Sequence, residues 1–69
     1  MARRDPRTSR SRQVYFEHVA IGASVKVSAI DAESGIEVSI AGPRTTSQKE
    51  LERIALQKLL RAMEREAGG

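Results

Sequence analysis

The sequence predicts an α+β domain, in which a three-stranded antiparallel meander precedes one C-terminal helix packed on one face of the sheet (β-β-β-α). Two observations support this prediction. Apolar and polar residues alternate on both arms of residues 24–42, with a turn-rich break between them. This alternation is typical of strands with one buried face and one solvated face. A helix-capping pattern and a helical apolar repeat then begin near residue 47.

The chain has 69 residues, of which 39% are apolar and 3% aromatic. This length allows one domain at most, and its core must be thin and aliphatic, which favours self-association. The chain lacks cysteine, so disulfides and thiolate sites are excluded. No apolar run approaches the roughly 18–20 residues of a membrane span. We therefore expect a cytoplasmic protein without membrane association, with a tail at residues 1–12 and a domain at 13–67.

The basic charge of the chain is concentrated in its first twelve residues, which carry a net charge of +4, whereas the remaining residues carry −1. This stretch has no apolar periodicity, so we expect it to be disordered. It is either a solubilising extension or an arm that contacts RNA or DNA phosphates. The candidate nucleic-acid contacts are Arg3, Arg4, Arg7, Arg10 and Arg12.

Residues 13–21 are rich in β-branched and aromatic side chains and predict the first strand. Which of its faces points inward is ambiguous. One face carries Val14, Phe16, His18 and Ala20, and the other carries Tyr15, Glu17, Val19 and Ile21. A bulge near Val19 would reconcile the two by switching faces midway along the strand. Gly22-Ala23 then makes a tight connection into the central strand.

The second and third strands form a hairpin around residues 31–35, where Asp31 can bond the backbone and Gly35 can adopt a positive φ. Gly42-Pro43 ends the third strand, because proline cannot continue a central ladder. Residues 47–50, Ser-Gln-Lys-Glu, form a capping box in front of a helix that we expect at residues 48–66.

The apolar arc of this helix is broader than one sheet face requires. Its expected buried stripe contains Leu51, Ile54, Ala55, Leu59, Ala62 and Met63. Leu56 and Leu60 fall outside that stripe. We expect a two-fold homodimer through the helix, with Leu56, Leu60 and Met63 at the interface. The alternative is that Leu56 and Leu60 lie at the sheet margin under the first strand.

The sequence shows no arrangement of residues that indicates catalysis, and we expect no enzyme activity, cofactor, metal ion or small-molecule substrate. His18 is the only histidine. Without a second histidine or a cysteine, we expect it to be a half-buried strand residue hydrogen-bonded to a neighbour, or a polar group at the sheet rim, rather than a metal ligand. Asp31 and Glu33 lie in the predicted turn, where carboxylates are usually solvated and have structural roles.

The segments of residues 22–31 and 34–40, followed by Gly42-Pro43 and the helical stretch of residues 55–60, resemble a small family of uncharacterised alphaproteobacterial proteins with a domain of unknown function. The resemblance covers about residues 14–63 and implies the β-β-β-α fold but no activity. His18 departs from it, since the family is expected to have an apolar or aromatic residue there. We therefore expect a non-catalytic, homodimeric interaction module. The alternative is a nucleic-acid- or ribosome-associated accessory protein that uses the tail.

Overall fold

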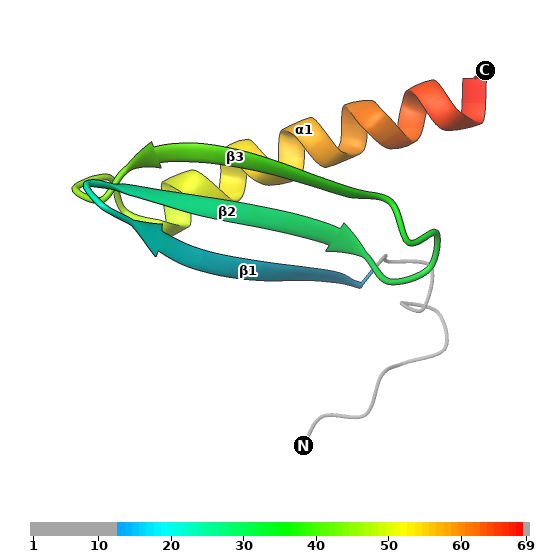
Figure 1. The fold of residues 1–69 in the computed structure, drawn as a ribbon. Coiled ribbons are helices and arrows are strands. Elements are labelled where there is room, and N and C mark those ends of the chain that lie inside the picture. Colours follow the sequence, from blue (N-terminus) through cyan, green and yellow to red (C-terminus); the bar gives the residue numbers. More distant parts are fainter. Residues whose placement is uncertain (1–12, 69) are drawn as a thin grey trace, which may run out of the picture.

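The computed structural model describes residues 13–68, which form a three-stranded sheet and one long helix (Figure 1). The elements are β1 (Val14–Ile21), β2 (Ser24–Asp31), β3 (Glu37–Pro43) and α1 (Gln48–Gly68). The strands are antiparallel and lie in the order β1-β2-β3, so the predicted meander and its C-terminal helix are confirmed. The tail lies outside the described residues.

The pairing of β1 with β2 is uninterrupted from the Val14–Asp31 pair to the Ile21–Ser24 pair. The bulge expected near Val19 was therefore wrong. The face that carries Phe16 points towards α1, and the opposite face of the sheet is left open. Val19 and Ile21 consequently remain 47% and 60% exposed. No face switch is needed, because α1 covers only one side of the sheet and these two side chains stay in solvent.

Two glycines provide the positive φ angles that the tight turns require. Gly22, with φ of 58°, opens the two-residue connection between β1 and β2, and Gly35 has φ of 80°. Asp31 organises the second turn: its Oδ2 accepts a 2.8 Å hydrogen bond from the Ser34 amide, and its carbonyl accepts one from the Gly35 amide. These hydrogen bonds confirm the structural role predicted for Asp31 in the turn. Asp31 is fully buried, however, so the expectation of a solvated carboxylate was wrong.

The start of α1 follows the first half of the predicted capping box. The Ser47 hydroxyl accepts a 3.1 Å hydrogen bond from the Glu50 amide. The Glu50 carboxylate does not complete the box but accepts two hydrogen bonds from Arg53, at 2.6 and 3.3 Å. These hydrogen bonds, and then the guanidinium charge, lower the pKa of Glu50 below its ordinary value and raise that of Arg53.

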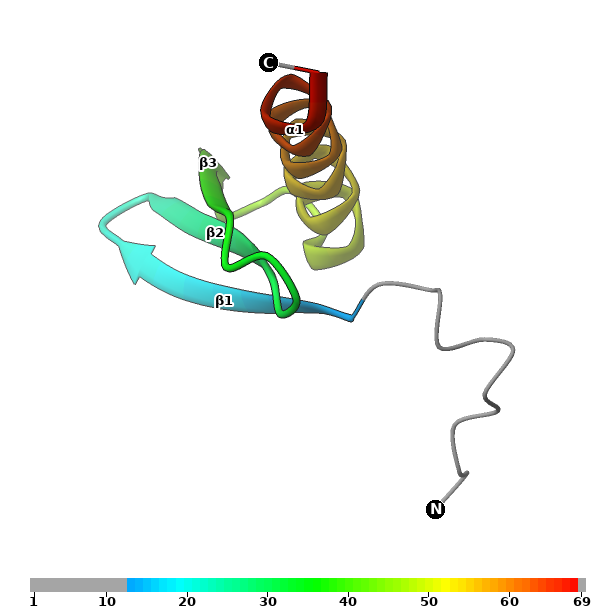
Figure 2. The same ribbon diagram turned by 90° about the vertical axis from the view of Figure 1, so that its right-hand side faces the viewer.

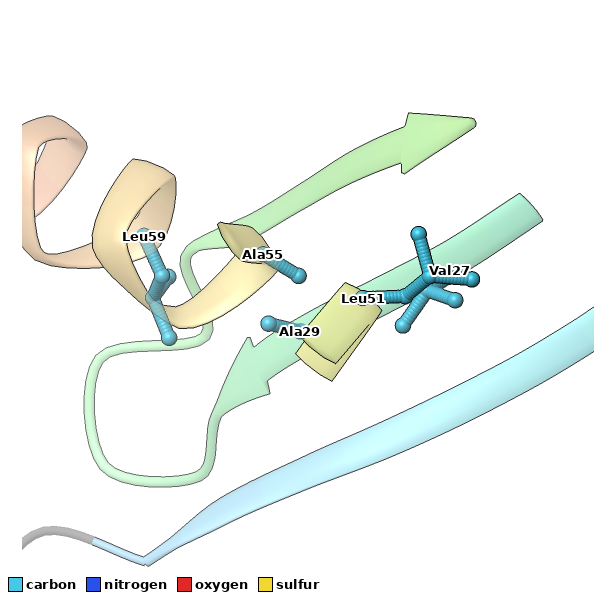
Figure 3. Packing of buried hydrophobic residues seen from close by; sticks show 5 residues of the cluster. All are labelled: Val27, Ala29, Leu51, Ala55 and Leu59. Carbon is cyan, nitrogen blue, oxygen red and sulfur yellow. The ribbon is translucent and has the colours of Figure 1, made fainter. Parts of the chain in front are cut away.

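The core lies between α1 and the central strand (Figure 3). Leu51, Ala55 and Leu59 point from one line of the helix onto β2, and all three are buried. Val27 and Ala29 of β2 are both 0% exposed. Ile54, which we expected in the buried stripe, is 38% exposed and was wrongly placed. Leu51, Ala55 and Leu59 are spaced four residues apart and face the sheet. Ile54, three residues after Leu51, therefore falls to one side of this contact.

Candidate interaction surface

The helix does not cover the sheet evenly, because α1 packs on β2 and β3 while β1 lies on the edge of the sheet away from it (Figure 2). Val14 and Phe16 of β1 point to the helix side and are half-buried against the core, whereas Ala20 is exposed. A strip of the sheet beside α1 is therefore left partly open along β1.

The flank of α1 above this strip carries the three residues proposed from the sequence for a dimer interface. Leu56 and Met63 are half-buried and pack against the core, and Leu60 is 46% exposed. We call Leu56, Leu60 and Met63 the β1-side flank. The alternative that Leu56 and Leu60 lie at the sheet margin holds partly for Leu56, whereas Leu60 keeps nearly half of its surface in solvent.

One polar contact joins β1 to α1 at the start of this flank. The Nε2 atom of His18 lies 3.0 Å from Oε2 of Glu52, and the two side chains are 23% and 34% exposed. Nε2 makes no well-aligned hydrogen bond, so the short distance describes an ion pair when the ring is protonated, not an oriented hydrogen bond. His18 is thus a half-buried strand residue, as predicted, but among the described residues its Nε2 atom lacks the hydrogen bond that was expected to a neighbour.

The opposite flank of α1 is different in character. There Ile54 and Ile40 lie in a shallow hollow beside Gln57 and three cations, Lys58, Arg61 and Arg65. Lys58 Nζ donates a 2.8 Å hydrogen bond to the carbonyl of Ser39 in β3. The exposed apolar side chains of α1 are therefore divided between a largely apolar β1-side flank and a cationic hollow beside β3.

The structure describes only some of the candidate residues named from the sequence. Arg3, Arg4, Arg7, Arg10 and Arg12 lie outside the described residues. Within residues 13–68, no helix is both long enough and apolar enough to cross a membrane.

The family of the chain follows from a comparison with known protein families. The family model for a domain of unknown function, DUF6898, matches residues 11–66. The chain belongs to this family. The match spans β1, β2, β3 and most of α1, so the DUF6898 domain coincides with the folded unit. No curated protein and no solved structure matches the chain.

Sequence reasoning missed one part of this surface, the open outer edge of β1. The signal was present in the composition of the two outer strands. Residues 14–21 contain no proline, glycine or lysine, whereas β3 contains Gly42 and Pro43 and has Lys58 bonded to its backbone. Proline and lysine are common protectors of sheet edges, so their distribution indicates which edge is open.

Proposed function

We propose that this domain is a non-catalytic interaction module that forms a homodimer through the β1-side flank of α1. The observation that carries the proposal is the 46% exposure of Leu60 between two half-buried apolar neighbours, Leu56 and Met63. These three residues lie on one side of the helix and form a continuous apolar surface, which a second copy would remove from water.

The small size of the core supports the same proposal. Five hydrophobic residues are buried in the described part of the chain, and two of them are alanines. Domains of this size commonly gain stability from oligomerisation. Apolar contact with a second copy beside α1 would enlarge the core without lengthening the chain.

The exposed surface of Leu60 limits the free energy that this residue can contribute to dimerisation. Full burial of a leucine side chain stabilises by about 1.5–3 kcal/mol, and Leu60 has roughly half of its surface left to bury. Two copies would then supply about 1.5–3 kcal/mol, whereas a micromolar dimer requires about 8 kcal/mol. Leu60 is therefore a sensitive reporter of the interface but needs other contacts beside it.

The test compares two matched substitutions on opposite flanks of α1. Leu60→Glu places a carboxylate in the proposed apolar interface, whereas Ile54→Glu places one at a similarly exposed site, beside the cationic hollow. We expect Leu60→Glu to raise the dimer dissociation constant at least tenfold, because two charges would lose water on association. Ile54→Glu should leave it within about twofold. Sedimentation velocity at tens of micromolar measures both, and Leu56→Glu combined with Leu60→Glu should abolish the dimer.

Two results would contradict the proposal. The first is a wild-type chain that remains monomeric at tens of micromolar. The second is a dimer that Leu60→Glu and Ile54→Glu weaken equally, since the interface would then not lie on the β1-side flank. Circular dichroism of each variant establishes that the fold is retained before its association is measured.

A second candidate function is association with RNA or DNA through the arginine-rich tail. The tail carries five arginines against one aspartate. The described residues add a further cationic site, because Lys58, Arg61 and Arg65 line one hollow without an acidic neighbour in it. Such cations bind phosphates by releasing counterions, without base recognition.

A further inference from the structure

The outer edge of β3 is obstructed. The hydrogen bonds from the Asp31 amide to the Ile36 carbonyl and from the Arg44 amide to the Ala23 carbonyl set which residues face β2. Because backbone groups alternate along an antiparallel ladder, the residues between these two bonds that face outward are Glu37, Ser39, Ala41 and Pro43.

Three features protect this β3 edge against another strand. The Ser39 carbonyl already accepts the hydrogen bond from Lys58 Nζ, and the Pro43 carbonyl accepts one from the Thr46 amide at 3.0 Å. Pro43 also has no amide hydrogen to donate. An incoming strand would have to displace Lys58 and could not form a complete ladder.

The outer edge of β1 has no such protection. The hydrogen bond from the Ala32 amide to the Gln13 carbonyl fixes the alternation on this side. The residues of β1 whose backbone groups face outward are therefore Val14, Phe16, His18 and Ala20. Among residues 13–68, no hydrogen bond engages these four amides and four carbonyls. An eight-residue strand with a full row of unpaired backbone groups is a ready template for another strand.

We propose that β1 of a second copy pairs antiparallel with this edge and joins the two sheets into one continuous six-stranded sheet. This inference rests on the proposed homodimer and states how its subunits meet. The two-fold axis of such a pair runs perpendicular to the sheet, so both helices lie on the same face. The two β1-side flanks then lie on the same face of the joined sheet, one on each side of the paired β1 strands. The pairing of these strands supplies contacts that Leu60 alone does not.

The open β1 edge and the obstructed β3 edge together limit the assembly to two copies. Each chain offers one accessible edge, and a β1–β1 pair uses both of them. The closed dimer leaves only the β3 edges outside, where Lys58 and Pro43 oppose further pairing. A sheet with two open edges would instead extend into filaments.

The exposed side chains on the open face of the sheet favour one register. Tyr15 and Ile21 are 53% and 60% exposed. A two-fold axis at His18 places Tyr15 of one copy opposite Ile21 of the other. This register pairs residues 15–21 of the two copies with one another and leaves Val14 opposite Gly22. An axis at Glu17 would instead oppose two carboxylates directly, which destabilises a cross-strand pair. The His18-centred register is therefore the one that we propose.

The first test places proline on each outer edge. Ala20→Pro removes an outward amide from β1, and Ala41→Pro removes one from β3; both alanines are exposed, and neither amide serves the chain's own sheet. We expect Ala20→Pro to shift the dimer to monomer in sedimentation velocity, with a loss of affinity of tenfold or more. Ala41→Pro should remain dimeric.

The second test determines the register by disulfide crosslinking. The protein has no native cysteine that could form competing disulfides. In the proposed register, position 15 of one copy lies about 4.5 Å in Cα distance from position 21 of the other, within disulfide range. A mixture of Tyr15→Cys and Ile21→Cys chains should form a disulfide-linked dimer under mild oxidation, whereas neither variant alone should. Efficient crosslinking of Glu17→Cys alone would indicate the Glu17-centred register and overturn the proposed one.

These outcomes separate the two proposals. A monomeric wild-type chain overturns both the homodimer and the strand pairing. A dimer that Leu60→Glu dissociates but Ala20→Pro leaves intact keeps the helix-mediated dimer and overturns β1 pairing. Equal dissociation by Ala20→Pro and Ala41→Pro also overturns it, because the effect would not be specific to the β1 edge. Growth into larger species would contradict the two-copy limit.

Discussion

At the residue scale, the packing of Leu51 of α1 on β3 depends on the absence of a side chain at Gly42. A Cβ atom built at this position would lie 2.7 Å from Cδ2 of Leu51. Leu51 is only 3% exposed and belongs to the buried line that faces β2. Gly42 is thus needed for packing, whereas Gly22 and Gly35 are needed for their backbone angles.

We expect Gly42→Val to lower the free energy of unfolding by about 1–3 kcal/mol, because the added carbons force Leu51 out of its position. Ala41→Val provides the control, since its side chain is on the open, exposed face of the same strand. Urea unfolding followed by circular dichroism measures both. A stability of Gly42→Val equal to that of the control would show that Leu51 adjusts freely.

At the element scale, α1 has more apolar surface than its contact with the sheet uses. The buried line of Leu51, Ala55 and Leu59 lies between two exposed apolar positions, Ile54 on one side and Leu60 on the other. The first turn of α1 is held both by the buried Leu51 and by the hydrogen bond from the Glu50 amide to Ser47.

We expect Ser47→Ala to destabilise the domain by about 1 kcal/mol, since the Glu50 amide loses the hydroxyl that accepts its hydrogen bond. Ser47→Asp should retain most of the stability, because aspartate also caps helices well. Unfolding is measured at one fixed protein concentration, because association shifts apparent stability. An unchanged free energy for Ser47→Ala would mean that water replaces the cap at no cost.

At the scale of the whole molecule, charge and fold are separated along the chain. The excess positive charge lies in residues 1–12, and the family match begins only at residue 11. Among residues 13–68, the core cluster is formed by β2 and α1, and side chains of β1 and β3 pack against it. Removal of the tail should therefore affect electrostatic binding without affecting the packed domain or the proposed dimer.

Deletion of residues 1–12 provides the corresponding test. If the tail binds nucleic acid, affinity for a mixed-sequence RNA should fall with salt, with a slope of about −0.7 to −0.9 per phosphate contact. It should also be lost in the deletion variant, while the sedimentation coefficient still reports a dimer. Fluorescence anisotropy across a salt series measures this. RNA binding that survives the deletion would indicate that the hollow of Lys58, Arg61 and Arg65 binds the phosphates instead of the tail.

Local pattern determined much of this protein. Alternation in β2, the turn residues Asp31 and Gly35, and Ser47 before an apolar repeat predicted the β-β-β-α order, because each depends on neighbours in the chain. The surplus of apolar residues on α1 was likewise visible, since helical periodicity alone places Leu60 outside a single stripe.

The tertiary structure decided what periodicity leaves open. Whether α1 lies over β1 or over β3 depends on how side chains from distant segments fit, including Leu51 against Gly42. That fit settled which face of β1 points inward, moved Ile54 out of the core and left the β1 edge uncovered. Burial is a property of both partners in a contact, so the alternation within one strand cannot specify it.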